Sequence, residues 1–519
     1  MTARLTTAVA LALCTAAPLA LAQGEEAPSS ERPGFSLANR QNEDWSRFDP
    51  AVEDSGRFYD TLDDFKHIDL ADDASIYLSI GGSARARYEH FENFGFGPGN
   101  DDGFLLTRLR LHGDLHVGEN LRFFIEGKSA FSTDRNLPGM QRTLDNDELA
   151  LQQAVADFTF DWGDDGTITL RAGRQQLLFG KQRLVSPLVW SNTMRSWDGI
   201  NATIKTGGWT YSLFWTQFAP VRKYDFNQSD RHTQFFGLYA SGLLCAEHGL
   251  SADLYFLGLD QDDPTNTYNG TTGAERRYTV GGRLFGKIAD TGWDYDTEAA
   301  YQFGDVGSAD INAWMFAGEL GYAYGDDWKT RAFLGFDYAS GDDNAGDGDV
   351  ETFNQLFPLG HAYLGYIDVV GRQNIMDFSV GASAKPMDKL TVRAALHVFW
   401  RASDNDALYN AGGGVVRGGG LAGGGGARST TAREAAGTGG GGRGGGLGTM
   451  GFSTTSTGRT GSGGGSVSAA AGSFSRRVTT MRSSSSSSSP TSSLKARPPI
   501  GDMPMDSWYA RRLRVSRSW

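Results

Sequence analysis

The chain has 519 residues and a formal net charge of −13 at pH 7, with 70 glycines, 12% aromatic residues and two cysteines. This length is far more than a small barrel needs, and two cysteines cannot staple a disulfide-rich secreted domain. No stretch beyond the N-terminus reaches the apolar length of a transmembrane helix, so a membrane protein with this composition would have to cross with strands.

The first predicted element is a secretory signal peptide over residues 1–22. Arg4 gives a positive start, residues 5–13 form a short apolar run, and Ala20-Leu21-Ala22 is a small-residue cleavage pattern. Cleavage near Ala22 removes one cysteine and leaves Cys245, which has no partner within the chain for a disulfide. The sequence therefore predicts export from the cytoplasm.

Residues 23–75 are polar and acidic and show no sustained hydrophobic period. We interpret them as an N-terminal periplasmic segment that is partly tucked into or under the domain that follows.

From residue 76 apolar and polar residues alternate, which is typical of strands. With the weaker candidates, about fifteen segments have the length that a tilted membrane strand requires. We predict an all-β, transmembrane antiparallel barrel over residues 76–410. The convincing segments are 76–91, 104–117, 121–131, 167–175, 209–218, 277–287, 293–303, 313–325, 329–339, 375–385 and 390–401, and the weaker ones lie near 150–160, 196–205, 233–241 and 249–257.

The predicted connections alternate between short and long. Residues 118–120 and 325–328 read as tight turns, which are expected on the periplasmic side. Residues 258–276 and 340–373 form long acid-rich loops, which are expected outside the cell.

The segment FLLTRLRLHGDLHV (104–117) shows which environment the two faces meet. Successive side chains of a strand point to opposite faces, so Leu105, Leu109 and Leu111 share one face, while Arg108 and Arg110 lie on the other. A soluble sandwich or propeller would alternate less faithfully and carry fewer charges at inward positions. Because a charge facing lipid at mid-membrane costs about 2–4 kcal/mol, we expect the charged face to line a lumen.

The same register predicts further cations on the inward face. Guanidinium groups in a narrow channel replace the hydration of anions and hold carboxylates bidentately. The alternative is that these groups pair with inward Asp and Glu and only stiffen the barrel, and individual residues divide between the two roles. The predicted substrate path consists of Arg85, Arg87, Arg108, Arg110, Arg171, Arg283, Lys287, Arg331, Arg393 and Arg401.

Two blocks go beyond periodicity. RAGRQQLLFGKQRLVSPLVWSNTMRSWDGI (171–200) resembles the signature of the alginate-export family of bacterial outer-membrane proteins, and YASGDDNAGDGDVETFNQLFPLGHAYLGYIDVVGRQNIMD (338–377) is similar to the same family. The resemblance covers roughly residues 60–410. It implies an 18-stranded barrel whose electropositive lumen passes an anionic uronate polysaccharide outward. It also implies a framework of lumen and loop residues that comprises Arg174, Gln175, Arg183, Arg195 and Asp198.

The alternation ends near residue 410. Residues 411–519 contain 27 Gly, 20 Ser, 14 basic and 3 acidic residues, so this tail is basic and the rest of the chain is acidic. Such a composition cannot bury a core and predicts disorder. About three closing strands of the family barrel are absent, and unpaired edges cannot exist in lipid. We interpret the tail as the product of a frameshift, or alternatively as a flexible surface-binding extension; resequencing codons 405–430 distinguishes the two.

Catalytic signatures are absent from the sequence. It has no G-x-S-x-G, H-E-x-x-H or Walker loop, and the acidic loop 342–349 departs from EF-hand spacing. We expect no enzyme activity, no cofactor and no metal.

The predicted function is an outer-membrane export channel for an anionic polysaccharide such as alginate. The alternatives are an anion-preferring diffusion porin for small acids and an adhesion or structural protein. Expected partners are outer-membrane lipid and lipopolysaccharide, the barrel-assembly machinery and periplasmic export proteins, with no nucleic acid.

Overall fold

The computed structural model describes residues 33, 40–46, 48, 58–73, 75–289, 291–387, 390–419 and 447–455, with the backbone alone for 58–61 and 447–455. All of them belong to one compact unit, residues 1–473, while the second unit, residues 474–519, lies outside the described residues. The predicted signal peptide and most of the predicted tail also lie outside them.

The described chain is built from strands. The long ones are β2 (Ile76–Phe91), β3 (Asp102–Val117), β4 (Leu121–Ser132), β5 (Asp147–Trp162), β6 (Gly166–Gln175), β7 (Ser196–Thr206), β8 (Trp209–Ala219), β9 (Thr233–Cys245), β10 (Leu250–Gln261), β13 (Glu275–Lys287), β14 (Trp293–Val306), β15 (Ala309–Ala323), β16 (Arg331–Ala339), β18 (Ile375–Met387), β19 (Leu390–Trp400) and β22 (Leu447–Thr455). The short ones are β1 (Ile68–Asp69), β11 (Thr267–Tyr268), β12 (Thr271–Thr272), β17 (Asp349–Val350), β20 (Leu408–Tyr409) and β21 (Val415–Arg417).

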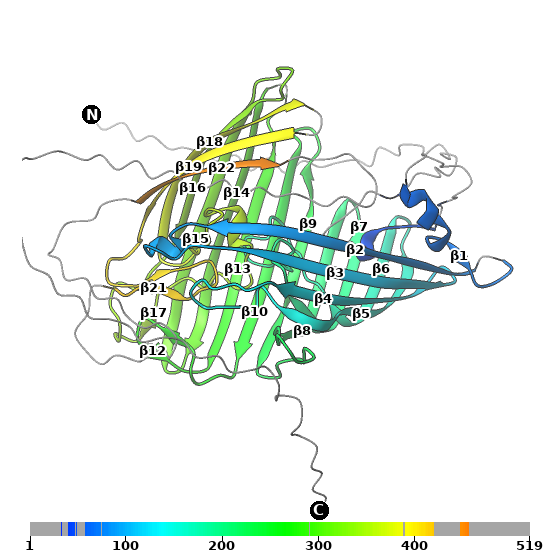
Figure 1. Cartoon of the computed structure of the whole chain (residues 1–519), viewed down its shortest axis with the longest axis horizontal. Helices are drawn as coiled ribbons and strands as arrows, with labels where there is room; N and C mark the ends of the chain where they lie inside the picture. Colours follow the sequence, from blue (N-terminus) through cyan, green and yellow to red (C-terminus); the bar gives the residue numbers. More distant parts are fainter. Residues whose placement is uncertain are drawn as a thin grey trace, which may run out of the picture. The chain divides into compact units, whose positions relative to one another are not determined.

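Each long strand pairs antiparallel with the next one along the chain, from β2 through β19, and β22 extends the sheet from β19. Figure 1 shows the strands side by side in this order, curving as a single sheet. The predicted all-β class and antiparallel sheet are confirmed. Among the described residues no hydrogen-bonded ladder joins β22 to β2, so the barrel does not close there.

The strands of the sheet have an inside-out burial pattern. On β3 the guanidinium-bearing residues Arg108 and Arg110 are 3% and 1% exposed, while Leu109 and Leu111 between and beside them are 47% and 60% exposed. A water-soluble sheet would bury the leucines and expose the arginines, because burying apolar surface is the main driving force for folding in water. We call the face that carries Arg108 and Arg110 the inner face.

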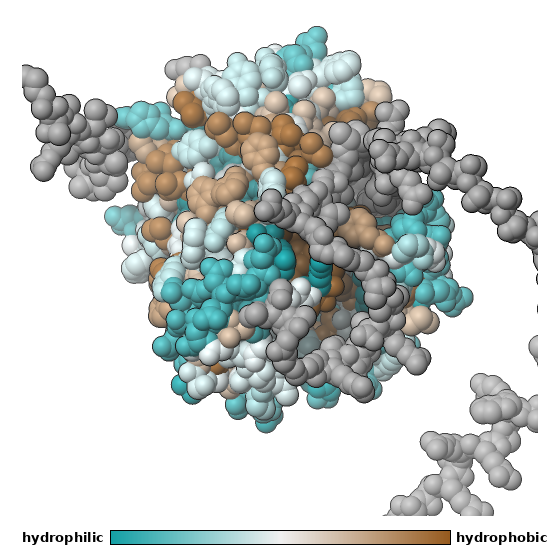
Figure 2. Space-filling view, turned by 90° about the vertical axis from the view of Figure 1, so that its left-hand side faces the viewer, coloured by the Kyte–Doolittle hydropathy of each residue, from teal (hydrophilic) through white to brown (hydrophobic). Residues whose placement is uncertain are grey.

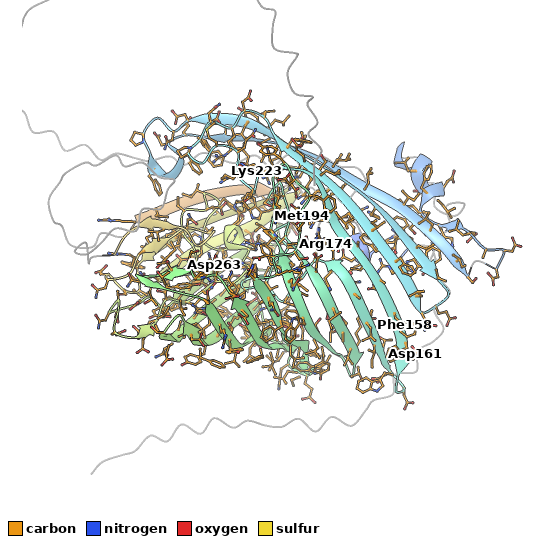
Figure 3. All side chains as sticks on the ribbon, turned by 90° about the horizontal axis from the view of Figure 1, so that it is seen from below. Phe158, Asp161, Arg174, Met194, Lys223 and Asp263 are labelled. Atoms are coloured by element: carbon orange, nitrogen blue, oxygen red, sulfur yellow. The ribbon has the colours of Figure 1, made fainter. Side chains whose placement is uncertain are left out.

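The connections divide into two kinds by the end of the sheet at which they lie. Short turns follow β3, β5, β7, β9, β13 and β15 at one end, and at the other end the loops 92–101, 133–146, 176–195, 220–232, 262–274 and 340–374 join the strands. Figure 3 shows Phe158 and Asp161 at the turn end and Asp263, which lies in a loop, toward the opposite end.

One connection departs from the predicted alternation. Val306 and Ala309 are paired in the ladder, so only Gly307 and Ser308 link β14 to β15 at the loop end. Gly307 adopts a φ of 61°, as a two-residue hairpin turn requires. The predicted loop 258–276 is also shorter in the structure, since Gln261 and Glu275 still pair in the ladder.

The helical elements are short 3-10 segments: η1 (Arg40–Asn42), η2 (Phe58–Phe65), η3 (Phe94–Phe96) and η4 (Gly360–Ala362). Within the described ranges, no helix has both the length and the apolarity to cross a membrane. Figure 2 views the molecule from the side on which Figure 1 places β12, β17 and β21, and hydrophilic side chains gather there below a group of hydrophobic ones.

The ordered part of the chain extends beyond the predicted boundary at residue 410. Tyr409 of β20 pairs with Val415 of β21, and β22 at 447–455 pairs with β19. These two segments are strands in the structure, whereas the disorder predicted for residues 411–519 stays a prediction. The remainder of the predicted tail lies outside the described residues.

Candidate functional site

The inner face of β2 and β3 carries two arginines directly opposite each other. Arg85 and Arg108 are Cα partners in the β2–β3 ladder. Side chains of directly opposed residues lie on the same face of the sheet, so two like charges share a small area. Within the described part of the chain neither forms an ion pair with a carboxylate.

Both guanidinium groups instead bind the backbone of the loop 176–195. Arg85 donates to the carbonyl oxygens of Trp190 and Ser191 at 3.1 and 2.6 Å. Arg108 donates to the carbonyl oxygens of Val189 and Ser191, both at 3.0 Å. Carbonyl oxygens satisfy the donors without cancelling the charge, so these two arginines fold the loop onto the inner face and keep their positive charge there.

Asn192 fastens the same loop to two strands and to a second loop. Its side chain is fully buried, and its amide nitrogen donates to the carbonyl oxygens of Thr107, Phe131 and Asp145 at 3.0, 3.0 and 2.8 Å. Three acceptors from β3, β4 and the loop 133–146 thus converge on one side chain. The sequence analysis quoted Asn192 within a family block but did not assign it a role; the Trp-Ser-Asn-Thr run was the available signal.

The loop 340–374 packs against the loop 176–195. Val185 and Phe357 form a parallel β-bridge, and Arg195 donates to the carbonyl oxygen of Pro358 at 2.9 Å. The rings of Trp190 and His361 stack with centroids 3.8 Å apart. The two loops therefore form one plug, which we call the inward plug.

Apolar side chains from the inward plug join those of the sheet in the largest hydrophobic cluster, which includes Leu184, Val185, Phe353, Phe214 and Phe235. Arg195 is partly buried beside this cluster, and desolvation lowers its pKa to about 10, so it is still charged at neutral pH. Gly180 at the start of the loop has a φ of 50°, and a Cβ there would lie 2.3 Å from the Tyr239 hydroxyl oxygen, so only glycine fits.

Most other predicted path residues are paired with carboxylates. Arg110 binds Glu126 at 2.8 Å, and both side chains are almost fully buried. Arg171 binds Asp157 through two hydrogen bonds of 2.7 Å. For these residues the structure agrees with the alternative that inward arginines stiffen the wall.

A second group of ion pairs lies on β10, β13 and β14. Arg283 binds Asp253 at 2.9 Å and Asp296 at 2.7 Å. The framework residue Arg183 reaches from the inward plug to Asp296 and Glu298, both at 2.9 Å. These contacts tie the plug to the wall opposite Arg85 and Arg108.

The remaining path residues are more exposed. Arg331 binds Asp294 and, at 2.8 Å, Glu319; Arg393 lies 4.0 Å from Glu319. Arg87 pairs with Glu89 at 2.8 Å, and Arg401 lies beyond β19, where it binds Asp404 at 3.0 Å. Lys287 is exposed at the turn end, and no ion pair to it is found within the described residues. The structure thus does not bring the ten predicted cations together in one ring.

Two framework residues point away from the inner face. Arg174 on β6 directly opposes Asp198 on β7. Asp198 is two positions from Ile200, which faces outward and is 61% exposed, so Asp198 and Arg174 lie on the outer face as well. Arg174 binds Asp198 at 2.7 Å and donates to the carbonyl oxygen of Asn227 at 3.0 Å, so the pair holds the loop 220–232. Figure 3 labels Arg174 on its strand. Gln175, by contrast, is fully buried on the inner face.

The N-terminal segment also reaches the inner face. The carbonyl oxygen of Gln41 accepts a hydrogen bond of 2.6 Å from Arg122, and its side-chain oxygen accepts one of 3.2 Å from Gln153. Trp45 accepts through its carbonyl oxygen a hydrogen bond with the His67 ring at 3.1 Å. In the described part of the chain, no three His, Cys, Asp or Glu side chains are grouped so as to hold a metal ion.

Comparison with known families gives one match, to a family model described as alginate export, over residues 76–436. This range starts later than the predicted resemblance over residues 60–410 and continues past residue 410. No curated protein sequence matches the chain.

Several solved structures resemble the chain at low identity. Pseudomonas aeruginosa OccK5 has 11% identity and a TM-score of 0.43, with 75% of this chain and 89% of the other covered. For Pseudomonas aeruginosa OccK3 the values are 13%, 0.41, 76% and 88%. For a triple mutant of the Rhodopseudomonas blastica porin they are 14%, 0.32, 62% and 94%. The family assignment rests on the match over residues 76–436 alone.

Proposed function

The chain belongs to the alginate export family of the bacterial outer membrane, and from this premise we propose that it is a channel through which an anionic polysaccharide such as alginate leaves the cell. The observation that carries this proposal is the pair Arg85 and Arg108. Their positive charges meet carbonyl oxygens rather than carboxylates, so the inner face keeps a local excess of positive charge. In the low-dielectric wall of a channel such charges favour anions over cations.

A diffusion porin for small acidic solutes is the second candidate, and the inward plug supports it. The loops 176–195 and 340–374 are joined by a β-bridge and by stacking of Trp190 on His361. A polymer chain needs these loops to separate, whereas a small acid needs only a path beside them. The two candidates therefore differ in whether the plug has to move.

Ion selectivity tests the part that both candidates share. In planar bilayers under a salt gradient, the full-length protein is expected to prefer chloride over potassium. Arg108→Ser and Arg85→Ser are each expected to lower that preference, whereas Arg231→Ser, which removes the same charge from the exposed loop 220–232, should leave it unchanged. Cation preference in the wild-type protein, or equal effects of all three substitutions, would overturn the shared proposal.

Polymer block separates the candidates. Addition of a long polyuronate to the open channel is expected to interrupt the current for an exporter, and a disulfide engineered between the two loops of the plug should abolish these interruptions but leave chloride current. If a monomeric uronate permeates equally with and without the disulfide while the polymer has no effect, the diffusion porin is correct.

The proposed partners follow from the two faces. Exposed leucines such as Leu109 and Leu111 face outer-membrane lipid and lipopolysaccharide, and the sheet is inserted by the barrel-assembly machinery. Periplasmic export proteins would deliver the polymer at the turn end. A protein used only for adhesion would show no current in the bilayer experiment.

A further inference from the structure

A cavity with a volume of about 1290 Å³ lies at the turn end of the inner face. Residues 176–180 of the inward plug and residues 41–46 of the N-terminal segment bound it, together with the inner faces of β2–β4 and β6–β9. Its volume exceeds the range of about 300–1,000 Å³ that is common for small-ligand pockets. A ligand larger than one sugar ring would therefore fit.

One wall of this cavity consists of neutral hydrogen-bonding groups. The ladders place Thr169, Thr203 and Ser212 in one row across β6, β7 and β8, since Thr169 opposes Thr203 and Thr203 opposes Ser212. In the next row Thr210 of β8 opposes Ser241 of β9. Directly opposed residues have Cβ atoms about 4.5–5.5 Å apart, so the hydroxyl groups are close neighbours. We call these five residues and Asn201 the hydroxyl wall.

The hydroxyl wall retains hydrogen-bonding capacity. Ser212 donates to the side-chain oxygen of Asn201 at 3.1 Å, and the Thr169 and Thr159 hydroxyls share a bond of 2.9 Å. For the hydroxyls of Thr203, Thr210 and Ser241, no protein partner is found within the described residues. Hydroxyl and amide groups both donate and accept, which is what recognition of sugar hydroxyls requires.

Two cations adjoin the hydroxyl wall, and of these only Lys205 lacks an ion pair with a described residue. Lys205 of β7 opposes Thr210, lines the cavity and forms no ion pair with any described residue. The other cations of the cavity are paired, Arg171 with Asp157 and Arg122 with Asp114. Glu43, Asp44, Asp73 and Glu119 on the other walls repel an anion. A ligand carboxylate therefore has one favourable position, beside Lys205.

Aromatic rings bound the same end of the cavity. Phe179 and Tyr239 stack with centroids 4.7 Å apart, and both line the cavity. Phe179 also stacks on Phe214 and Tyr239 on Tyr255, so the two rings offer apolar edges rather than open faces to the C–H groups of a sugar, while the hydroxyl wall serves its polar edge. The combination of apolar ring edges, hydroxyls and one unpaired cation matches a sugar that carries a carboxylate.

We propose that this cavity is a binding site for an acidic oligosaccharide of the uronate type, in which Lys205 binds a carboxylate and the hydroxyl wall binds the ring hydroxyls. The site lies on the turn side of the inward plug and holds the polymer end before it passes the plug. This inference rests on the proposed function, because it deepens the substrate class of the same channel.

Calorimetry on the full-length protein in detergent tests the proposal, with a hexauronate as the probe and a neutral glucan hexamer as the comparison. The hexauronate is expected to bind and the neutral hexamer to bind much more weakly. Lys205→Ala, and Thr203→Val combined with Ser241→Ala, are each expected to weaken hexauronate binding about tenfold or more, as loss of a charge-assisted or several neutral hydrogen bonds predicts.

Lys329→Ala is the matched control. Lys329 is exposed in the turn 324–330 at the same end of the sheet and does not line the cavity. The substitution therefore removes the same charge as Lys205→Ala but leaves the site unchanged. If Lys329→Ala and Lys205→Ala weakened hexauronate binding equally, the binding would come from general charge attraction, and the proposed site would be wrong. Heat-dependent gel migration, which reports folded barrel, confirms that each variant is folded.

Together with the bilayer experiment on Arg85 and Arg108, calorimetry shows whether the cavity site or the channel function fails. Absence of hexauronate binding in a chloride-preferring channel would overturn the cavity proposal alone. Equal binding of the neutral and acidic hexamers would overturn the role of Lys205. Hexauronate binding that depends on Lys205, in a protein that passes no current, would support the site and overturn the channel.

Discussion

The inner faces of β2–β4 and of β7–β9 differ in their side chains: the first carries arginines that bind other protein groups, and the second carries neutral hydroxyl groups. On β2–β4, Arg85, Arg108 and Arg110 are largely buried and use their donors on loop carbonyls and on Glu126. On β7–β9, Thr203, Thr210 and Ser241 have no protein partner within the described residues. A buried charge has to be satisfied by the protein, whereas a hydroxyl at a water-filled cavity does not. The charged wall therefore positions the plug, and the neutral wall remains free to meet a solute.

The largest expected effect is on the charged wall, in Arg110→Ala. This substitution leaves Glu126, which is fully buried, without its partner, and breaking a buried ion pair in this way costs about 3–5 kcal/mol. The free energy of unfolding in urea, measured for the protein in liposomes, should fall by that amount.

The matched control is the double variant Arg110→Met with Glu126→Leu. Because it removes both charges, most of the lost free energy of unfolding is expected to return. If the single and double variants are equally unstable, the ion pair is not what stabilises this wall.

An intermediate effect is expected for Arg108→Ala, which acts on the plug rather than on the wall. It removes the donors to the carbonyl oxygens of Val189 and Ser191, and hydrogen bonds from charged groups contribute about 1.5–3 kcal/mol. Hydrogen exchange of the loop 176–195 should become faster, and single-channel conductance should rise. Lys205→Ala on β7 serves as the control, since Lys205 forms no ion pair with the loop 176–195 among the described residues. If Lys205→Ala also made hydrogen exchange of this loop faster, the charged and the neutral wall would not differ in their effect on the plug.

The smallest effect is expected for Thr203→Val on the hydroxyl wall. The hydroxyl has no partner to lose among the described residues, and valine has nearly the same shape and a higher strand propensity. The free energy of unfolding is expected to change by less than about 0.5 kcal/mol, measured in the same urea experiment. A loss comparable with that of Arg108→Ala would show that the neutral wall is structural too.

The sequence was sufficient to predict the strands and their two faces. Each of the fifteen predicted segments overlaps a strand of the structure, and Leu109, Leu111, Arg108 and Arg110 lie on the predicted faces. This success has a local cause, because alternation with a period of two depends only on neighbouring residues. The pairing of Arg85 with the carbonyl of Ser191, by contrast, joins residues 106 positions apart.

Arg174 and Asp198 show where reasoning from motifs was incomplete. The family block placed them in a shared framework of lumen and loop residues, and the structure places them together under the loop 220–232 on the face opposite to Arg108. Gly173 precedes Arg174 with a φ of 124°, where a Cβ would lie 2.1 Å from the carbonyl oxygen of Ala154. A motif states which residues occur together but not on which side of the wall they face.

The sequence by itself determined the class of the fold, the inside-out distribution of charge and the positions of most turns, because these follow from side-chain period and from the cost of exposing charge to lipid. The tertiary structure decided which arginines keep an uncancelled charge, that the loops 176–195 and 340–374 join into one plug, and that a neutral wall with one lysine borders a cavity. These properties depend on strand register and on the path of loops across the inner face, and they bring together residues that are far apart in the chain.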